Sequence, residues 1–304
     1  SDLLVLSRGR RSTMCIKRSV LTDVFKLLLT ILAIGLFTAF APAQKPLSIG
    51  VTDELYSRSL GEKRTVNIYL PDGYKPGDAT KYPVVYLLDG GMDEDFIQVT
   101  GIVQFDSFPW IGRVPPSIVV GIVNVDRRRD MTFPTTIQAD RKRYPTTGHS
   151  DKFIVFLKDE LQPFIASKYH GSGERTIIGE SLGGLLAAEI LFKEPELFDR
   201  YVIVSPSVWW DNGSILNSAT DRLKSKASPT AVYIGVGKEG LTPTEIPRVQ
   251  TVDANLLDDK LRKIGNPSLR VSFDYLPDED HATVSHQAIF NAFRLLYPAT
   301  KVAN

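Results

Sequence analysis

Cysteine is almost absent from this sequence, which has 304 residues and only Cys15 of that type. One thiol cannot form an intramolecular disulfide, so the fold must depend on its apolar core. Biased tracts and internal repeats are lacking as well, and 43% of the residues are hydrophobic. This composition is typical of a globular protein with one large core.

An excess of one charge is also missing, because 36 Lys and Arg face 35 Asp and Glu. The balance gives no reason to expect a nucleic-acid partner. The four histidines contain no metal-binding spacing such as H-E-x-x-H. We therefore expect neither a metal nor an organic cofactor, and the remaining partner to expect is a small molecule.

Long hydrophobic runs are rare, and the one at Leu27–Phe40 follows a basic lead and precedes Ala41 and Ala43. This order is typical of a secretory signal, so we expect residues 1–43 to be a signal peptide cleaved after Ala43. The alternative is an N-terminal membrane anchor, although the run is shorter than the roughly 20 residues that span a bilayer. A secreted or periplasmic single domain would then cover residues 44–304.

Beyond residue 44, short apolar runs alternate with helical patterns, which predicts an α/β fold with a mostly parallel sheet covered on both faces. Consecutive strands before Pro83 predict an antiparallel edge. The expected strands are Arg64–Leu70, Pro83–Gly91, Pro116–Val125, Arg175–Gly179, Tyr201–Ser205, Thr230–Gly237 and Arg270–Leu276. The expected helices are Asp151–Tyr169, one from Leu182, Val252–Ile264 and Val284–Leu296.

The stretch Gly179-Glu180-Ser181-Leu182-Gly183 has the G-x-S-x-G pattern, between a predicted strand and a predicted helix. That context is the one required by a nucleophile elbow, a sharp turn that exposes a strained serine at the end of a sheet. We expect glycine to be needed at Gly179 and Gly183, because a Cβ atom there would collide where the strand and the helix fold against each other. We expect Ser181 to be a nucleophile. The alternative is a glycine-rich turn with a serine that faces solvent.

A serine hydroxyl needs a base, usually a histidine held by a carboxylate. In this architecture the chain order is serine, acid, histidine. His281 follows the last predicted strand and precedes the last helix, so we expect it to be the base. The other histidines lie before Ser181 or inside that helix (His149, His170 and His286).

The acid is less clearly marked. Glu239 follows the strand that ends at Gly237, between the serine and His281 in the chain. Asp211 is the main competitor, because some hydrolases supply the acid one strand earlier; Asp253 and Glu245 are further alternatives. A dyad without an acid is also conceivable, since such a site retains some activity.

The developing oxyanion needs hydrogen-bond donors. One is expected to be the backbone N–H of Leu182, directly after the serine. The other is expected in the loop after the strand that ends in "LLDGG", with Gly91 N–H as candidate and Met92 next. Asp89 and Gly90 could instead form a simple turn that ends the strand.

Taken together, these segments resemble the putative-esterase family of α/β-hydrolases, and within it the predicted hydrolases related to siderophore esterases. The matching segments are "LGEKRTVNIYLPDGY", "YPVVYLLDGG", "RRRDMTFPTT", "IIGESLGGLLAAEIL", "SPSVWWDNG" and "DEDHATV". The resemblance runs from about Leu60 to the last helix.

The resemblance implies the roles already given to Ser181, His281, Leu182 and Gly91, and less firmly that of Glu239. Many relatives have histidine at the position of Glu180. We expect this departure to affect local packing more than mechanism.

Substrate-binding residues are only weakly indicated. The segment Asp126–Asp151 is expected to be a long loop, and its arginines, Arg127 and Arg128 among them, would suit an anionic substrate such as a ferric catecholate. A solvated charged face explains the same residues. Trp209 and Trp210 could stack on an aromatic acyl group or cover the end of the sheet.

The sequence thus predicts a serine esterase that forms an acyl-enzyme on a small or siderophore-like ester. Two alternatives remain open: an acyltransferase of the same fold, and a catalytically inactive binding module. The pattern does not indicate which ester is cleaved or the oligomeric state.

Overall fold

The computed structural model describes residues 20–30, 44–45, 47–77 and 79–297. The chain divides into two units, Ser1–Ser48 and Ile49–Asn304. In the first unit residues 20–30 form a helix, and most of the expected signal segment lies outside the described residues. No helix in the described part of the chain is both long and apolar enough to cross a membrane.

The second unit contains a single eight-stranded sheet in the order β1-β2-β4-β3-β5-β6-β7-β8. All pairs from β4 to β8 are parallel, whereas β1–β2 and β2–β4 are antiparallel. The predicted parallel sheet with an antiparallel edge is therefore confirmed. The strands are β1 (Val51–Ser57), β2 (Glu62–Tyr69), β3 (Tyr82–Leu87), β4 (Ile118–Ile122), β5 (Gly171–Glu180), β6 (Arg200–Val204), β7 (Thr230–Gly237) and β8 (Leu269–Leu276).

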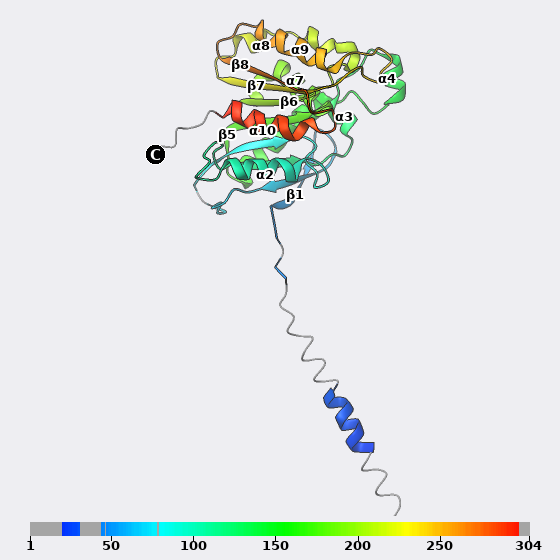
Figure 1. Ribbon diagram of the computed structural model, residues 1–304, viewed down its shortest axis with the longest axis vertical. Helices are drawn as coiled ribbons and strands as arrows, with labels where there is room; N and C mark the ends of the chain where they lie inside the picture. The colour runs from blue at the N-terminus through cyan, green and yellow to red at the C-terminus, as the bar shows by residue number, and fades with distance from the viewer. Residues whose placement is uncertain (1–19, 31–43, 46, 78, 298–304) are drawn as a thin grey trace, which may run out of the picture. The chain divides into compact units, whose positions relative to one another are not determined.

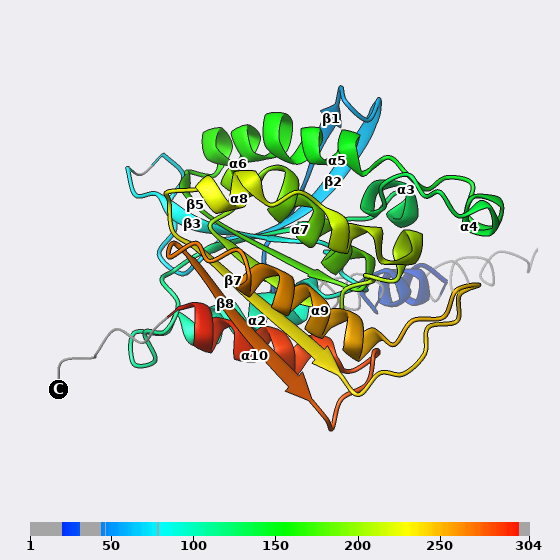
Figure 2. The same cartoon turned by 90° about the horizontal axis from the view of Figure 1, so that it is seen from above.

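Helices cover both faces of this sheet, as predicted. Figure 1 looks onto the face covered by α2 and α10, and Figure 2 shows α5, α6 and α7 on the opposite side of the strands. The helices are α2 (Phe96–Asp106), α3 (Arg127–Met131), α4 (Gln138–Arg143), α5 (Ser150–Val155), α6 (Gln162–Lys168), α7 (Leu182–Lys193), α8 (Asp221–Ser225), α9 (Gln250–Arg262) and α10 (Val284–Leu296). A π-helical turn (Phe156–Leu161) joins α5 to α6, and 3₁₀ turns cover Pro195–Leu197 and Trp210–Asn217.

Each face of the sheet packs its own apolar cluster. Side chains of α5, α6, α7 and α9 bury one face, with Ile165, Leu186 and Leu257 fully buried. Side chains of α2 and α10 bury the other, with Val99 and Phe293 at 0% exposure. The continuous apolar runs of the central strands are explained by this two-sided burial.

The prediction of one long loop over Asp126–Asp151 is wrong, because the segment contains α3 and α4. The start of α3 is capped by Asp126, whose carboxylate accepts the Arg129 N–H at 3.0 Å. Its end is anchored by Asp130, which bonds the fully buried Arg64 of β2 at 2.6 Å. A buried ion pair with the neighbouring β2 thus fixes a helix too short to be stable alone.

The parallel strands direct their carboxyl ends to one edge of the sheet, where reactive groups of such folds collect. Ser181 directly follows β5, Ser205 directly follows β6, and Glu239 follows β7. Because β5, β6 and β7 are neighbours in the sheet, these three residues meet at one place.

Candidate active site

The turn after β5 is sharp and strained at the serine. Ser181 has φ 57° and ψ −115°, a conformation that L-residues rarely adopt. A Cβ added to Gly179 would lie 2.3 Å from the Gly183 carbonyl oxygen, so only glycine fits there. This is the close approach of strand and helix that the G-x-S-x-G pattern predicts.

The requirement for a second glycine lies one residue later than expected. A Cβ on Gly183 would meet its nearest neighbours at 3.4 Å, which is ordinary contact. A Cβ on Gly184 would lie 2.9 Å from the Val204 carbonyl oxygen and 3.0 Å from Pro206. The helix that begins at Leu182 therefore packs closely on the end of β6 through Gly184.

Ser181, His281 and Glu239 form one hydrogen-bonded line. The His281 ring contacts Ser181 Oγ through Nε2 at 3.1 Å and Glu239 Oε2 through Nδ1 at 2.6 Å. A carboxylate can only accept, so Nδ1 carries the proton and Nε2 is free to accept the Ser181 hydroxyl. This arrangement is the one needed to remove a proton from a serine.

Glu239 is fixed at both carboxylate oxygens. Its Oε1 accepts the hydroxyl of Ser205, whose backbone oxygen accepts the Gln250 side-chain amide at 2.7 Å. The sequence did not indicate Ser205, although it lies in the quoted segment "SPSVWWDNG". Its hydroxyl orients the acid toward His281.

The competing acids are engaged elsewhere. Asp211 accepts hydrogen bonds from the Thr135 hydroxyl at 3.0 Å and from the Thr136 N–H at 2.6 Å. Asp253 is bonded by the Arg248 guanidinium at 2.6 Å, and Glu245 lines a surface groove. Among the described residues, Glu239 is the carboxylate bonded to Nδ1 of His281.

Several groups hold the imidazole of His281 toward its charged form. The hydrogen bond to Glu239 and the negative charge of Glu180 raise the pKa of His281 above its usual 6.5, while burial and the charge of Arg127 oppose this. An imidazolium formed during a reaction would therefore be stabilised.

The two expected oxyanion donors differ in whether their backbone N–H groups already have an acceptor. Leu182 is the first residue of α7, where a backbone N–H has no acceptor within its helix. The Gly91 N–H instead donates to Glu94 Oε2 at 2.8 Å. Gly91 can donate to a substrate only after the Glu94 carboxylate has moved.

The loop that carries Gly91 is held by ionic contacts. Asp89, with φ 55°, accepts two bonds from the Arg127 guanidinium at 2.6 and 2.9 Å and one from the Asn124 amide at 2.6 Å. Asn124 also donates to Glu94 at 2.8 Å. Asp89 is thus the centre of a polar cluster rather than part of a simple turn.

The predicted substrate-binding residues are largely committed to such structural contacts. The Arg127 guanidinium donates to Asp89, and that of Arg128 lies 4.7 Å from the centre of the Tyr144 ring. Trp210 is only 1% exposed and donates its indole N–H to the Phe133 carbonyl at 2.8 Å. The prediction that Trp210 can stack on an acyl group is therefore wrong, while Trp209 is half-buried and packs against the core.

Two further side chains reach the serine and histidine. The Ser207 hydroxyl lies 3.2 Å from Ser181 Oγ. Glu180 Oε1 lies 3.4 Å from Nε2 of His281, and burial raises the pKa of this carboxyl to about 7. Glu180 was expected to affect local packing more than mechanism, and its side chain lies close to the His281 ring.

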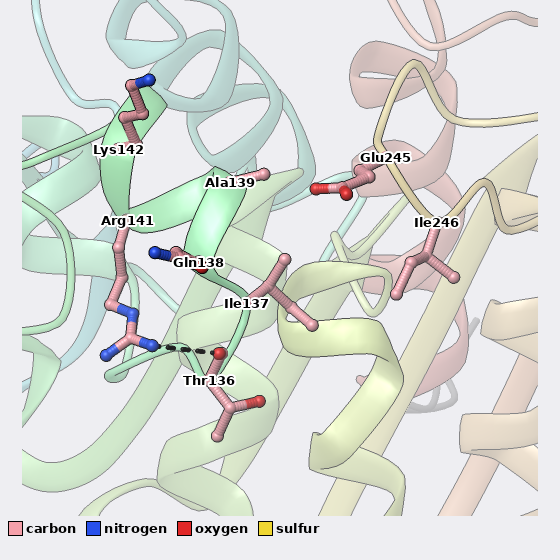
Figure 3. Close-up of a pocket in the computed structure, with 8 residues that line it drawn as sticks. All are labelled: Thr136, Ile137, Gln138, Ala139, Arg141, Lys142, Glu245 and Ile246. Atoms are coloured by element: carbon pink, nitrogen blue, oxygen red, sulfur yellow. Dashed lines mark hydrogen bonds between the residues drawn. The ribbon is translucent and has the colours of Figure 1, made fainter.

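A groove of about 820 Å³ lies between α4 and the segment 241–249. Figure 3 shows Glu245 and Ile246 across from Ile137 and Ala139, while Arg141 donates to the Thr136 carbonyl at 3.2 Å. In one wall Thr136 donates its N–H to Asp211 at 2.6 Å, and the other wall follows Glu239 in the chain. In the described part of the chain, no His, Cys, Asp and Glu side chains group so as to hold a metal ion.

The sequence profile of the family described as "Putative esterase" matches residues 57–265. The ferri-bacillibactin esterase BesA of Bacillus subtilis is 29% identical over 259 residues, which cover 79% of this chain and 88% of that protein. An IroE-like serine hydrolase from Shewanella oneidensis is 31% identical with a TM-score of 0.73, over 82% of this chain and 80% of that structure. The BES protein from Bacillus cereus is 28% identical with a TM-score of 0.70, over 84% and 98% respectively.

Proposed function

Because the chain belongs to the Putative esterase family, we propose that it hydrolyses carboxylic esters through an acyl-enzyme on Ser181. The observation that carries this proposal is the line from Ser181 Oγ through His281 to Glu239, at 3.1 and 2.6 Å. A strained serine hydroxyl, a base in contact with it and an acid that fixes the tautomer are the parts that acyl transfer needs.

The reaction has two halves. As Ser181 Oγ attacks the ester carbonyl carbon, His281 Nε2 takes its proton, and the oxyanion accepts from the N–H groups of Leu182 and Gly91. Collapse breaks the bond to the leaving alcohol, which receives the Nε2 proton. Water then attacks the acyl group and gives its proton to His281, and that proton returns to Ser181 Oγ as the carboxylic acid leaves.

Hydrolysis of p-nitrophenyl acetate and butyrate tests this mechanism. We expect Ser181→Ala to abolish both turnover and labelling by a fluorophosphonate. A serine at the other end of β5, Ser172, accepts the Glu174 N–H at 3.2 Å, so Ser172→Ala is the matched control and should keep both activities. Turnover and labelling that survive in Ser181→Ala would overturn the assignment of the nucleophile.

The same assay with an added alcohol acceptor distinguishes hydrolysis from acyl transfer. A hydrolase releases the free acid as its main product, whereas a transferase forms a new ester at the expense of the acid. We expect the free acid to predominate, because water is the second nucleophile in the mechanism above.

For the substrate, we propose an ester of the siderophore type. The relative BesA is described as a ferri-bacillibactin esterase. A fungal protein described as a siderophore enterobactin esterase is 40% identical over 75 residues. The groove between α4 and the segment 241–249 adds the cations Arg141 and Lys142, both of them exposed, which would attract an anionic iron complex. Ferric siderophores, feruloyl esters and short acyl esters compared by kcat/KM test this, and a preference for feruloyl esters would contradict it.

We further propose that residues 1–43 act as a secretory signal. The compact second unit begins at Ile49, so cleavage after Ala43 would leave every strand of the sheet complete. The mass of the protein exported by a bacterial host should correspond to a chain that begins at Gln44. A chain that keeps residues 1–43 and stays with the membrane would instead support the anchor.

A further inference from the structure

Glu180 is an ionisable side chain that the proposed mechanism does not use. It ends β5, directly before Ser181, and its side chain is only 19% exposed. Oε1 is buried, and no described residue forms a hydrogen bond with it. Nε2 of His281 lies 3.4 Å from this oxygen.

Two other buried carboxylates of the same region are anchored by hydrogen bonds. Glu189 on α7 also has a buried oxygen without a donor, Oε2, but its Oε1 accepts from the Ser150 hydroxyl at 3.0 Å and pairs with Lys193. Glu239 accepts at both of its oxygens. A buried carboxylate oxygen without a donor is costly, so the position of Glu180 Oε1 calls for an explanation beyond packing.

The charges that face Glu180 come from four segments. Arg127 of α3 lies 4.0 Å from Oε2 and donates to the Glu180 carbonyl at 3.2 Å, but its guanidinium is already paired with Asp89. Asp89 and Asp95 repel the carboxylate, and His281 attracts it. A protonated His281 is therefore the one cation among these groups that Glu180 can gain as a new partner.

We propose that Glu180 is a positioning residue for His281, which as a carboxylate accepts the Nε2–H of the imidazolium. This inference rests on the proposed function, because it assigns Glu180 a role in the proton transfer between Ser181 and His281. In the charged state, the ring is held between Glu239 at Nδ1 and Glu180 at Nε2. When His281 is neutral, Nε2 has no proton and accepts a hydrogen bond from the Ser181 hydroxyl at 3.1 Å.

Two consequences follow from a carboxylate on each side of the ring. The imidazolium that forms as Ser181 attacks is stabilised in the transition state, which favours catalysis. The same stabilisation keeps His281 protonated to higher pH, so a higher pH is needed before the neutral ring is available as a base. Because the two groups interact, they lose their protons as a coupled pair.

The first test measures His281 directly by following its imidazole C–H resonance through a pH titration, with His281→Gln to assign it. We expect Glu180→Gln to move the midpoint of His281 to lower pH by on the order of one unit, because an opposite charge is lost. Glu180→Asp, which keeps the charge, should restore part of the shift. An unchanged midpoint in a folded Glu180→Gln protein would overturn the proposal.

The control is Glu189→Gln. This change removes a different buried carboxyl, on α7, and leaves the surroundings of His281 intact. We expect this variant to titrate His281 as the wild type does. This readout needs no substrate, so it remains informative if Ser181 proves not to be the nucleophile. Failure of the inference and failure of the proposed function are therefore distinguishable.

The second test is the pH dependence of ester hydrolysis. In Glu180→Gln the acid limb of kcat/KM should shift to lower pH with the titration midpoint of His281. At pH values above both midpoints, kcat should fall several-fold with little change in KM, because the lost interaction belongs to the charged transition state. A rise in KM alone would indicate that Glu180 contacts substrate instead.

Discussion

At the scale of single residues, Glu239 and Asp211 differ most clearly in their hydrogen-bond partners. Both are acidic side chains that follow neighbouring strands, yet only Glu239 reaches His281, with Oε2 at 2.6 Å from Nδ1. Asp211 instead fixes Thr135 and Thr136, which precede α4. Their exchange for amides should therefore have different effects on catalysis.

We expect Glu239→Gln to lower kcat by about 10²- to 10⁴-fold, because an amide can donate to Nδ1 and favour the wrong tautomer. Asp211→Asn is the matched variant and should keep kcat close to wild type. Steady-state kinetics with p-nitrophenyl butyrate measure both. If Asp211→Asn were the more damaging change, the assignment of the acid would have to be reversed.

Glu180 also links pH to stability. Its pKa is raised from 4.5 to about 7 in the folded protein, mainly by burial. The folded state therefore binds the proton more tightly than the unfolded chain, so stability falls as pH rises from about 4.5 to about 7. Glu180→Gln removes this loss and should raise the Tm at pH 8 by about 5 °C, but not at pH 4. Thermal scans at the two pH values measure it, and an equal effect at both would contradict the explanation.

At the scale of elements, the turn between β5 and α7 is the most constrained feature. Gly179→Ala would bring a methyl group to 2.3 Å from the Gly183 carbonyl oxygen. We expect a loss of more than about 3 kcal/mol in the free energy of unfolding, because backbone cannot move aside as a side chain can. Gly173 of the same strand has nothing within 4 Å of such a methyl group, so Gly173→Ala should be nearly neutral. Urea denaturation of both variants gives the comparison.

The sequence allowed some elements to be predicted almost completely. Thr230–Gly237 and Val284–Leu296 are found with the expected bounds, because a buried strand and an amphipathic helix each repeat an apolar pattern over many residues. The serine turn was also predictable, since Gly179 is required by its close contact with Gly183 within the turn itself.

Other elements depend on contacts that a local pattern does not contain. The helices α3 and α4 have five and six residues, too few for an apolar period, and α3 is held by Arg64 from β2. The contact of the Glu180 side chain with His281 likewise joins residues that are 101 positions apart in the chain. Those features became visible only in three dimensions.

At the scale of the whole molecule, the buried clusters found among the described residues belong to the second unit. Every residue of the two apolar clusters lies beyond Ile49. A chain shortened to residues 44–304 should therefore keep the Tm and the kcat/KM of the chain of residues 1–304. Removal of residues 44–57 as well deletes β1, which pairs with β2 along Val51–Ser57, and should lower the Tm. If the first truncation were the damaging one, the N-terminal unit would have a structural role.

The proposed catalytic groups enter the chain in the order Ser181, Glu239, His281, and the imidazole comes after the last strand of the sheet. During synthesis the elbow can leave the ribosome well before its base does. A nascent or truncated chain that ends before β8 therefore carries a serine with no imidazole to activate it. The proposed reactivity toward esters would thus be withheld until β8 and the loop that carries His281 have both been synthesised.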